Sequence, residues 1–265
     1  MESFFNGNEI RDNILLGLRK KIFDDKKNVQ LAVIIAGDNP VCEKYVALKE
    51  KIANKLGVFF CLYRFDKGDT TEDIVESIKF LNNDEEIDGI MVQIPVAPEF
   101  DRDELIRAIS PKKDIDGLRY CLKLDSEFRP PVVLAILEAL QRSQKNLQES
   151  KVLIVGRGFL VGDPLFRTLK EMGVEAIVAD SATTNLKELA LKSDVIISAV
   201  GKANIITPDM AKPRVVLIDA GTTEQSGTLI GDIDPLAFKD SDYYTPVPGG
   251  IGPVTIAMLF KNLIG

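Results

Sequence analysis

Apolar runs alternate with amphipathic stretches through the first hundred residues. The runs that predict strands, because each is short and almost continuously apolar, lie at 30–37, 58–65 and 87–95. The stretches that predict helices, by their three-to-four-residue spacing, lie at 9–23, 41–56 and 70–81. Gly57 follows the second helix at the position that favours glycine. Continuous apolar strands separated by helices predict a mainly parallel sheet covered on both faces.

The alternation stops after Asp101 and resumes at Lys151. Between them we expect a short helix at 102–109, an irregular stretch, and a helix after Pro130-Pro131. The four later apolar runs are KVLIV, EAIVAD, SDVIISAV and RVVLIDAG. A glycine-bearing turn after the first of these runs predicts a doubly wound nucleotide-binding domain. A last helix is expected at 253–263.

Charge and hydropathy narrow the possible partners. The chain has 265 residues and a formal net charge of −7, which argues against a nucleic-acid partner. The sequence has no 18-residue apolar run and no signal-peptide pattern at its start, so we expect no membrane association and a cytoplasmic protein.

Side-chain chemistry narrows the possible reactions. The sequence has no histidine, which removes the commonest general base and metal ligand. Cys42, Cys61 and Cys121 are few and widely spaced, so we expect reduced thiols and no metal site. Any catalysis must then use lysine, tyrosine, carboxylates or backbone groups.

The segment GRGFLVGDP carries Gly156, Gly158 and Gly162 between a predicted strand and a predicted helix. Glycines there let backbone N–H groups approach an anion at the start of a helix. Because the spacing is one residue longer than the usual dinucleotide fingerprint, a simple tight turn also explains it. The flanking strand and helix favour a dinucleotide.

Four further segments combine polar groups or rigid loops with positions where ligands bind. Tyr45 and Lys49 lie four apart on one helical face, and Gln93 follows a buried strand. The turn KKDIDG at 112–117 is acidic, and TPVPGGIGPVT at 245–255 is a proline- and glycine-rich loop before the last helix. Taken singly, each has an ordinary explanation: a solvated helix face, an edge hydrogen bond, an Asx turn and a domain-crossing turn.

Together and in this order, the segments resemble one family, the bifunctional methylenetetrahydrofolate dehydrogenase/methenyltetrahydrofolate cyclohydrolases. The resemblance runs from about residue 30 to the C-terminus. The segments that carry it are GDNP, Tyr45 with Lys49, VQIP, KDIDG, GRGFLVGDP, SAVGKA, DAGTT, GDI and PVPGGIGPVT.

The resemblance implies a function and an architecture. The chain would oxidise 5,10-methylenetetrahydrofolate and hydrolyse the methenyl product to 10-formyltetrahydrofolate, in one-carbon metabolism and purine biosynthesis. An N-terminal α/β folate-site domain, 1–130, would be completed by 244–265, with the C-terminal helix returning to it. A Rossmann-type NAD(P)-binding domain would span 131–243. A homodimer is expected because the family usually forms one.

The resemblance also implies residue roles. Lys49 would be the acid/base of the hydrolytic step, oriented by Gln93, while Tyr45 would stack along the folate and Asp116 would hold the pterin. The loop with Pro248, Gly249 and Gly250 would lie near nicotinamide and folate. The cofactor-binding residues would be Gly156, Arg157, Gly158, Gly162, Asp180, Ser181 and Gly201.

The choice between NADP and NAD rests on residues that disagree. Arg157 and Ser181 match family positions that face the 2′-phosphate of NADP. Asp180 ends the second strand of this domain, where an acidic residue bonds an unphosphorylated ribose and repels a phosphate. We expect NADP, because two matches outweigh one substitution.

Several departures from the family leave alternatives open. Cys42 replaces a serine, Gly158 replaces the fingerprint serine, and the family's PCTPxG segment is Pro130-Pro131-Val132-Val133 here. The alternatives are an NAD-dependent or single-activity member, a folate- or nucleotide-binding relative with little catalysis, and a dehydrogenase of the shikimate or amino-acid type.

Overall fold

The computed structural model describes residues 4–265 and divides into two compact units. The N-terminal unit comprises Asp12–Pro131 and Ile256–Gly265. The C-terminal unit comprises Val132–Thr255 together with the residues up to Arg11. Within the described residues no helix is long and apolar enough to cross a membrane.

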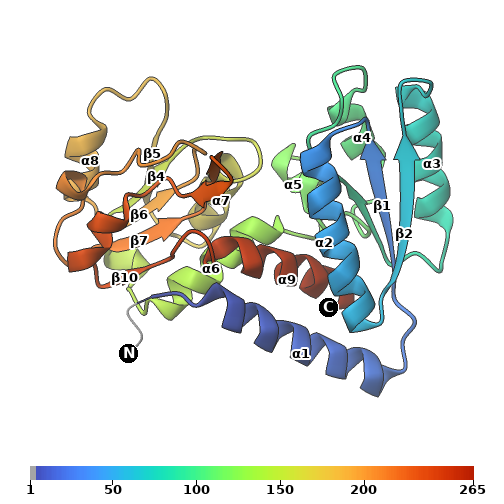
Figure 1. Ribbon diagram of the computed structural model, residues 1–265, viewed down its shortest axis with the longest axis horizontal. Coiled ribbons are helices and arrows are strands. Elements are labelled where there is room, and N and C mark those ends of the chain that lie inside the picture. Colours follow the sequence, from blue (N-terminus) through green and yellow to red (C-terminus); the bar gives the residue numbers. More distant parts are fainter. Residues whose placement is uncertain (1–3) are drawn as a thin grey trace. The chain divides into compact units, whose positions relative to one another are not determined.

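The N-terminal unit contains a three-stranded parallel sheet in the order β2-β1-β3 (Figure 1). Its strands are β1 (Gln30–Ala36), β2 (Phe59–Phe65) and β3 (Gly89–Val92). Its helices are α1 (Gly7–Asp25, which begins in the C-terminal unit), α2 (Pro40–Leu56), α3 (Thr71–Asn83), α4 (Arg102–Ala108) and α5 (Leu118–Cys121). Because right-handed crossovers lead from β1 out to β2 and then back across to β3, α2 and α3 lie on opposite faces of the sheet.

Helix termini in this unit follow local sequence rules. Asn39 caps α2 by accepting from the backbone N–H of Val41 at 2.9 Å, and Gly57 ends the helix with a left-handed φ of 81°. Thr70 and Asp73 form a capping box at the start of α3. The predicted helices are therefore confirmed to within a few residues.

The C-terminal helix α9 (Ile251–Ile264) supplies part of the N-terminal unit's core. Leu259, Phe260 and Leu263 are buried there among the side chains of β1 and α2. Asn262 donates from Nδ2 to the backbone oxygens of Ile115 at 2.8 Å and Arg129 at 3.0 Å. The expected return of the last helix to the first domain is confirmed.

The C-terminal unit contains a five-stranded parallel sheet in the order β10-β7-β6-β4-β5. Its strands are β4 (Val152–Val155), β5 (Ala176–Ala179), β6 (Val195–Ser198), β7 (Val216–Asp219) and β10 (Tyr243–Tyr244), and a separate antiparallel pair joins β8 (Thr223–Gln225) to β9 (Thr228–Ile230). Its helices and 3-10 turns are α6 (Pro131–Arg142), η1 (Leu147–Glu149), α7 (Gly162–Glu171), α8 (Leu186–Lys192), η2 (Pro208–Met210) and η3 (Pro235–Asp240). The predicted two-domain α/β fold with a Rossmann-type sheet is confirmed.

In each sheet the chain adds its second strand on one side of the first strand and its third strand on the other side. This topology predicts where a ligand binds. In the N-terminal unit the chain leaves β1 on one side for β2 and returns on the other as β3. In the C-terminal unit β5 and β6 flank β4 in the same way. Ligands of open α/β sheets bind at the carboxyl ends of strands at such a switch point. The loops after β1 and β3, and those after β4 and β6, are therefore the candidates.

Three expectations about the strands need correction. The third strand ends at Val92 rather than residue 95, because Pro95 has no N–H with which to extend the ladder. The strand β2 is only partly buried, since it lies at the edge of its sheet, and Phe59 is 57% exposed. The sequence pattern also missed β10 and the β8–β9 pair, which are two or three residues long.

Candidate active site

Lys49 and Gln93 meet in the N-terminal unit at the switch point of its sheet. Lys49 lies on α2, and its Nζ donates to Gln93 Oε1 at 2.9 Å and approaches Met91 Sδ at 3.3 Å. Gln93 directly follows β3, is buried, and donates from Nε2 to the carbonyl of Ile94 at 2.7 Å. The predicted pair of lysine and glutamine is thus brought together, with the amide oxygen fixed toward the amine.

Burial suits Lys49 to carry a proton. It lowers the pKa of the ammonium group, while the negative charge of Asp116 acts in the opposite direction. Burial likewise raises the pKa of Asp116, and the charge of Lys49 opposes that rise. Each group therefore moderates the other, and a lysine with a lowered pKa has more of the uncharged amine that can accept a proton.

Asp116 is placed by a turn that Asp114 holds. The buried Asp114 carboxylate accepts from the backbone N–H of Leu118 at 3.1 Å and of Arg119 at 2.7 Å. Gly117 has a left-handed φ of 64°, and a Cβ there would lie 2.5 Å from the backbone nitrogen of Pro130. The acidic segment is more than an Asx turn, because its backbone and that of the next loop are packed without space for a side chain.

Tyr45 and Cys42 lie one and two turns before Lys49 on the same helix. Tyr45 is 47% exposed, as a residue that stacks on a ligand requires. Cys42, which replaces the family's serine, is buried and directs its Sγ to the carbonyl of Pro95 at 3.5 Å. Burial raises the pKa of this thiol, so it stays uncharged.

Two glycines after β4 allow neighbouring backbone segments of the C-terminal unit to pack closely together. A Cβ at Gly156, whose φ is 102°, would lie 2.6 Å from the carbonyl oxygen of Ala199. A Cβ at Gly162, the first residue of α7, would lie 2.1 Å from the carbonyl oxygen of Gly156. A Cβ at Gly158 would meet nothing within 4 Å. This leaves room beside the start of α7, where no side chain caps the helix.

The residues expected to distinguish NADP from NAD, by what they offer to the 2′ position of the adenosine ribose, lie in two turns. Arg157 is largely exposed, and its Nε lies 3.9 Å from Asp163 Oδ1. Asp180 accepts from the backbone N–H of Ala182 at 3.0 Å, so its carboxylate is engaged within its own turn, while Ser181 is exposed. The structure therefore pairs Arg157 with Asp163, whereas the Asp180 carboxylate bonds within its own turn.

The proline- and glycine-rich loop is rigid. Gly249 has a left-handed φ of 97°, and its carbonyl oxygen accepts from the backbone N–H of Gly7 at 2.9 Å. A Cβ at Gly250 would lie 2.3 Å from the carbonyl oxygen of Pro246. Pro248 follows a cis peptide bond. The loop ends at residue 250, because α9 already begins at Ile251.

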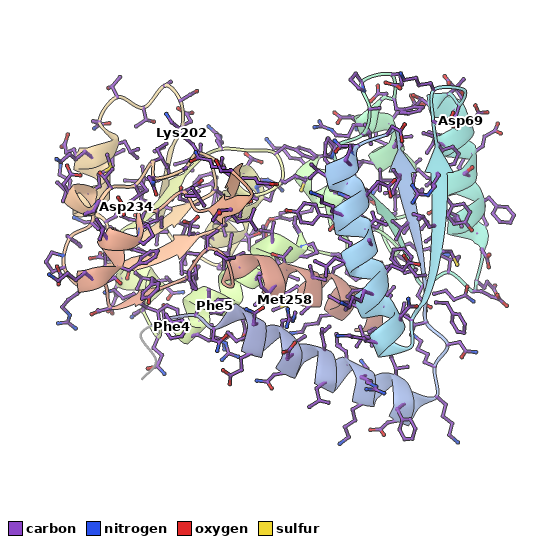
Figure 2. The ribbon with its side chains drawn as sticks, in the orientation of Figure 1. Phe4, Phe5, Asp69, Lys202, Asp234 and Met258 are labelled. Atoms are coloured by element: carbon purple, nitrogen blue, oxygen red, sulfur yellow. The ribbon has the colours of Figure 1, made fainter. Side chains whose placement is uncertain are left out.

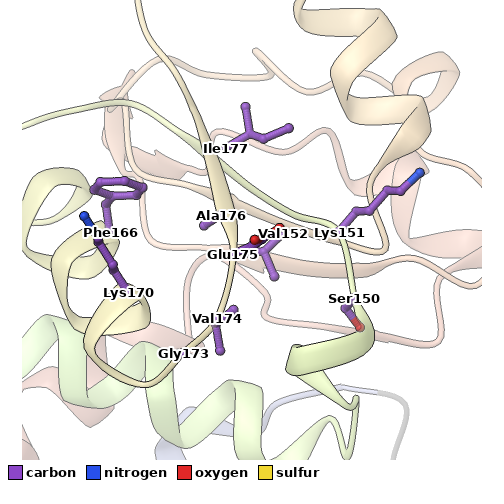
Figure 3. Close-up of a pocket in the computed structure, with 10 residues that line it drawn as sticks. All are labelled: Ser150, Lys151, Val152, Phe166, Lys170, Gly173, Val174, Glu175, Ala176 and Ile177. Carbon is purple, nitrogen blue, oxygen red and sulfur yellow. The ribbon is translucent and has the colours of Figure 1, made fainter.

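A hollow of about 510 Å³ lies at the opposite end of the C-terminal unit's sheet (Figure 3). It is lined by Val152 and Ala176, the first residues of β4 and β5, and by Phe166, Lys170 and others. None of the predicted site residues lines it. Because ligands of parallel sheets bind at the carboxyl ends, this hollow is not the candidate site.

Some residues that shape these sites were not predicted. They are Asp114, Asp219, Asp232, Thr245 and Asn262. Asp219 and Asp232 could have been recognised from the sequence, because a carboxylate inside the glycine-bearing segments DAGTT and GDI is unusual near buried strands. Among residues 4–265 no group of three His, Cys, Asp or Glu side chains could hold a metal ion.

Comparisons with known proteins agree along the whole chain. Residues 5–116 match the family described as the tetrahydrofolate dehydrogenase/cyclohydrolase catalytic domain, and residues 130–265 match its NAD(P)-binding domain. The chain is 37% identical over 263 residues to bifunctional protein FolD 2 of Lactobacillus johnsonii, covering 97% of this chain and 93% of that protein.

Solved structures of FolD proteins have the same fold as this chain. The crystal structure of bifunctional FolD from Campylobacter jejuni has a TM-score of 0.92 at 32% identity, with 98% of this chain and 96% of that chain covered. FolD from Trypanosoma brucei, in complex with NADP and an inhibitor, has a TM-score of 0.90 at 28% identity, with 98% and 95% covered.

Proposed function

The chain belongs to the tetrahydrofolate dehydrogenase/cyclohydrolase family, and we propose that it oxidises 5,10-methylenetetrahydrofolate with NADP and then hydrolyses the 5,10-methenyl product to 10-formyltetrahydrofolate. The observation that carries the proposal is the 2.9 Å contact between Lys49 Nζ and Gln93 Oε1, within the electrostatic influence of Asp116. An idle binding relative has no need to bury an amine beside a fixed amide.

Lys49 moves the protons of the hydrolytic step. Water adds to the methenyl carbon, and the uncharged amine of Lys49 accepts the proton that the water loses. The same ammonium returns a proton to the ring nitrogen as its bond to carbon breaks, while the hydroxyl group of the adduct releases its proton to solvent and becomes the formyl oxygen on the other nitrogen. Gln93 holds the amine by accepting its hydrogen bond, which orients the amine to accept the proton of the attacking water.

Asp116 and Tyr45 bind and orient the folate. The Asp116 carboxylate accepts from the amino edge of the pterin, which gives charge-assisted hydrogen bonds. The exposed ring of Tyr45 stacks along the folate. We assign the folate site to residues 1–130, completed by 244–265, and count Pro248, Gly249 and Gly250 among the substrate-binding residues.

We assign cofactor binding to residues 131–243. Gly156 and Gly162 let the backbone close up around the start of α7, where a pyrophosphate binds, and Gly158 leaves the approach open. Gly201, in the loop after β6, lies at the same switch point. When bound, NADP supplies the acceptor for the hydride that leaves the methylene carbon. The chain's own contribution to that step is positioning.

NADP is proposed over NAD because of Arg157 and Asp180. The Arg157 guanidinium is exposed and suits a phosphate dianion, whereas the Asp180 carboxylate is engaged by the backbone of its own turn. We expect catalytic efficiency to be higher with NADP, and Arg157→Ala to lose about tenfold with NADP and little with NAD. Kinetics with both cofactors on the parent, Arg157→Ala and Asp180→His test this. A parent that prefers NAD and swings toward NADP in Asp180→His contradicts it.

The hydrolytic activity is expected to depend on pH through Lys49. Since the uncharged amine is the active form, the rate at saturating methenyl substrate rises with pH through the lowered pKa of Lys49 and then levels off. The Asp116 charge holds that pKa up, so Asp116→Asn moves the rise to lower pH. The loss of methenyl absorbance without cofactor, corrected for the uncatalysed reaction, gives the profile. A rise that stays in place, or moves to higher pH, counts against the coupling.

A homodimer is also proposed, from the family resemblance alone, together with the cytoplasmic location that we expect from the sequence. Light scattering on the purified chain should give twice its 29.2 kDa mass. A mass of one chain at all concentrations contradicts the dimer.

A further inference from the structure

Two buried carboxylates lie side by side in the C-terminal unit without a role in the reactions described above. Asp219 ends β7 and is 2% exposed, and Asp232 follows β9 and is fully buried. A Cβ at Gly221 would lie 2.1 Å from the Asp232 carboxylate, and one at Gly231 would lie 2.2 Å from Asp219 Oδ2. The two glycines therefore leave the space that the carboxylates fill.

Asp232 is surrounded by donors from the loop after β6. Its Oδ2 accepts from Ser198 Oγ at 2.8 Å, from the backbone N–H of Val200 at 2.7 Å and from that of Gly201 at 3.3 Å. Its Oδ1 accepts from the backbone N–H of Lys202 at 2.8 Å. Three successive peptide groups and one hydroxyl group thus point their hydrogens at one carboxylate.

Asp219 fixes the segment that carries Asp232. It accepts from the backbone N–H of Asp232 at 3.2 Å, of Ile233 at 2.8 Å and of Gly221 at 3.1 Å. Its own backbone N–H donates to Thr245 Oγ1 at 2.7 Å, directly before the loop of Pro248. Burial raises the pKa of Asp219 to about 7. The pair therefore ties the loops after β6, β7, β9 and β10 together.

The direction of the peptide groups decides what the Gly201 loop offers to a ligand. A trans peptide points its carbonyl opposite to its N–H. Since the N–H groups of Val200, Gly201 and Lys202 point to Asp232, the carbonyl oxygens of the residues before them face away from it. The Ala199 oxygen lies against Gly156, so the acceptors left to the loop are the oxygens of Val200 and Gly201. The loop therefore presents acceptors, which suit hydroxyl and amide donors and not a phosphate.

We propose that Asp232 is a positioning residue for the ribose and carboxamide half of the nicotinamide cofactor, acting by turning the N–H groups of 200–202 inward and the carbonyls outward. The proposal rests on the proposed cofactor site, and it divides that site by chemistry. The glycine turn at 156–162 takes the phosphates, and the loop at 199–202 takes hydrogen-bond donors. Asp219 supports Asp232 by fixing its backbone.

Asp232→Asn tests the proposal, because it replaces one carboxylate oxygen by an NH₂ group. That NH₂ group cannot accept a hydrogen bond from the backbone N–H that points at it. We expect affinity for NADP to fall about tenfold or more, while affinity for adenosine 2′,5′-bisphosphate, which lacks the nicotinamide half, stays within twofold. Amide exchange in the peptide containing residues 199–203 should rise. Asp234→Asn, two residues on and partly exposed, is the matched control and should change neither affinity (Asp234 and Lys202 are labelled in Figure 2).

Two results would overturn the proposal: equal loss for both ligands, which indicates general damage, or unchanged NADP affinity. If Asp232→Asn does not fold, Ser198→Ala removes one donor to the same carboxylate. It should weaken NADP several-fold and leave the bisphosphate unaffected, and no selective change contradicts the proposal. If the parent binds neither ligand, the proposed cofactor site fails, and the exchange rates still report whether Asp232 orders the loop.

Discussion

Lys49→Met is expected to lower hydrolysis of 5,10-methenyltetrahydrofolate by about 100-fold or more and to reduce the dehydrogenase much less. Methionine keeps the length and apolar stem of lysine but has no proton to exchange. Hydride loss from the methylene carbon requires alignment of the reactants rather than a base, so it does not need the amine. Separate assays of the two half-reactions on one preparation measure the split.

Lys51→Met is the matched control, because Lys51 lies on the same helix and is exposed. It should leave both activities within about twofold of the parent, since exposed positions contribute little. Equal loss of both activities in Lys49→Met would show that Lys49 acts in binding or folding, and not as the proton carrier of one step.

Asp116→Ala is expected to weaken folate binding by roughly 2 to 3 kcal/mol, which is about 30- to 150-fold, because it removes charge-assisted hydrogen bonds to the pterin. NADP affinity should stay nearly unchanged, since Asp116 belongs to the N-terminal unit. Equilibrium titration with a non-reacting folate is the suitable readout, because the same substitution also alters the pKa of Lys49.

Asp24→Ala, an exposed carboxylate on α1, controls for the loss of one negative charge. It should bind folate as the parent does. A folate titration that is the same in Asp116→Ala and in the parent would mean that the turn at 114–117 is structural only.

Much of the fold followed from local patterns in the sequence. The continuous apolar runs became parallel strands, and Gly57 and the Thr70 cap ended and began helices as expected. The pattern failed for β10 and for the β8–β9 pair, because two or three residues hold no periodicity. The Ser226-Gly227 turn, in which both residues have positive φ, was nevertheless a usable hairpin signal.

The site was predictable only in part. Spacing placed Tyr45 and Lys49 on one helical face, but their link to Gln93 came from the family resemblance, because 44 residues separate the lysine from the glutamine. The contacts of Asp232 to 198–202 were beyond prediction for the same reason. Side-chain direction was also undetermined, as Arg157 illustrates: its partner is Asp163 rather than Asp180.

Incubation of the purified chain with 5,10-methylenetetrahydrofolate and NADP tests the bifunctional assignment most directly. Reduced nicotinamide is followed by its absorbance and 10-formyltetrahydrofolate by chromatography in the same reaction. We predict that both products form in the parent, and that Lys49→Met still reduces the cofactor but accumulates the methenyl compound. Failure of the parent to reduce either NADP or NAD would contradict the assignment.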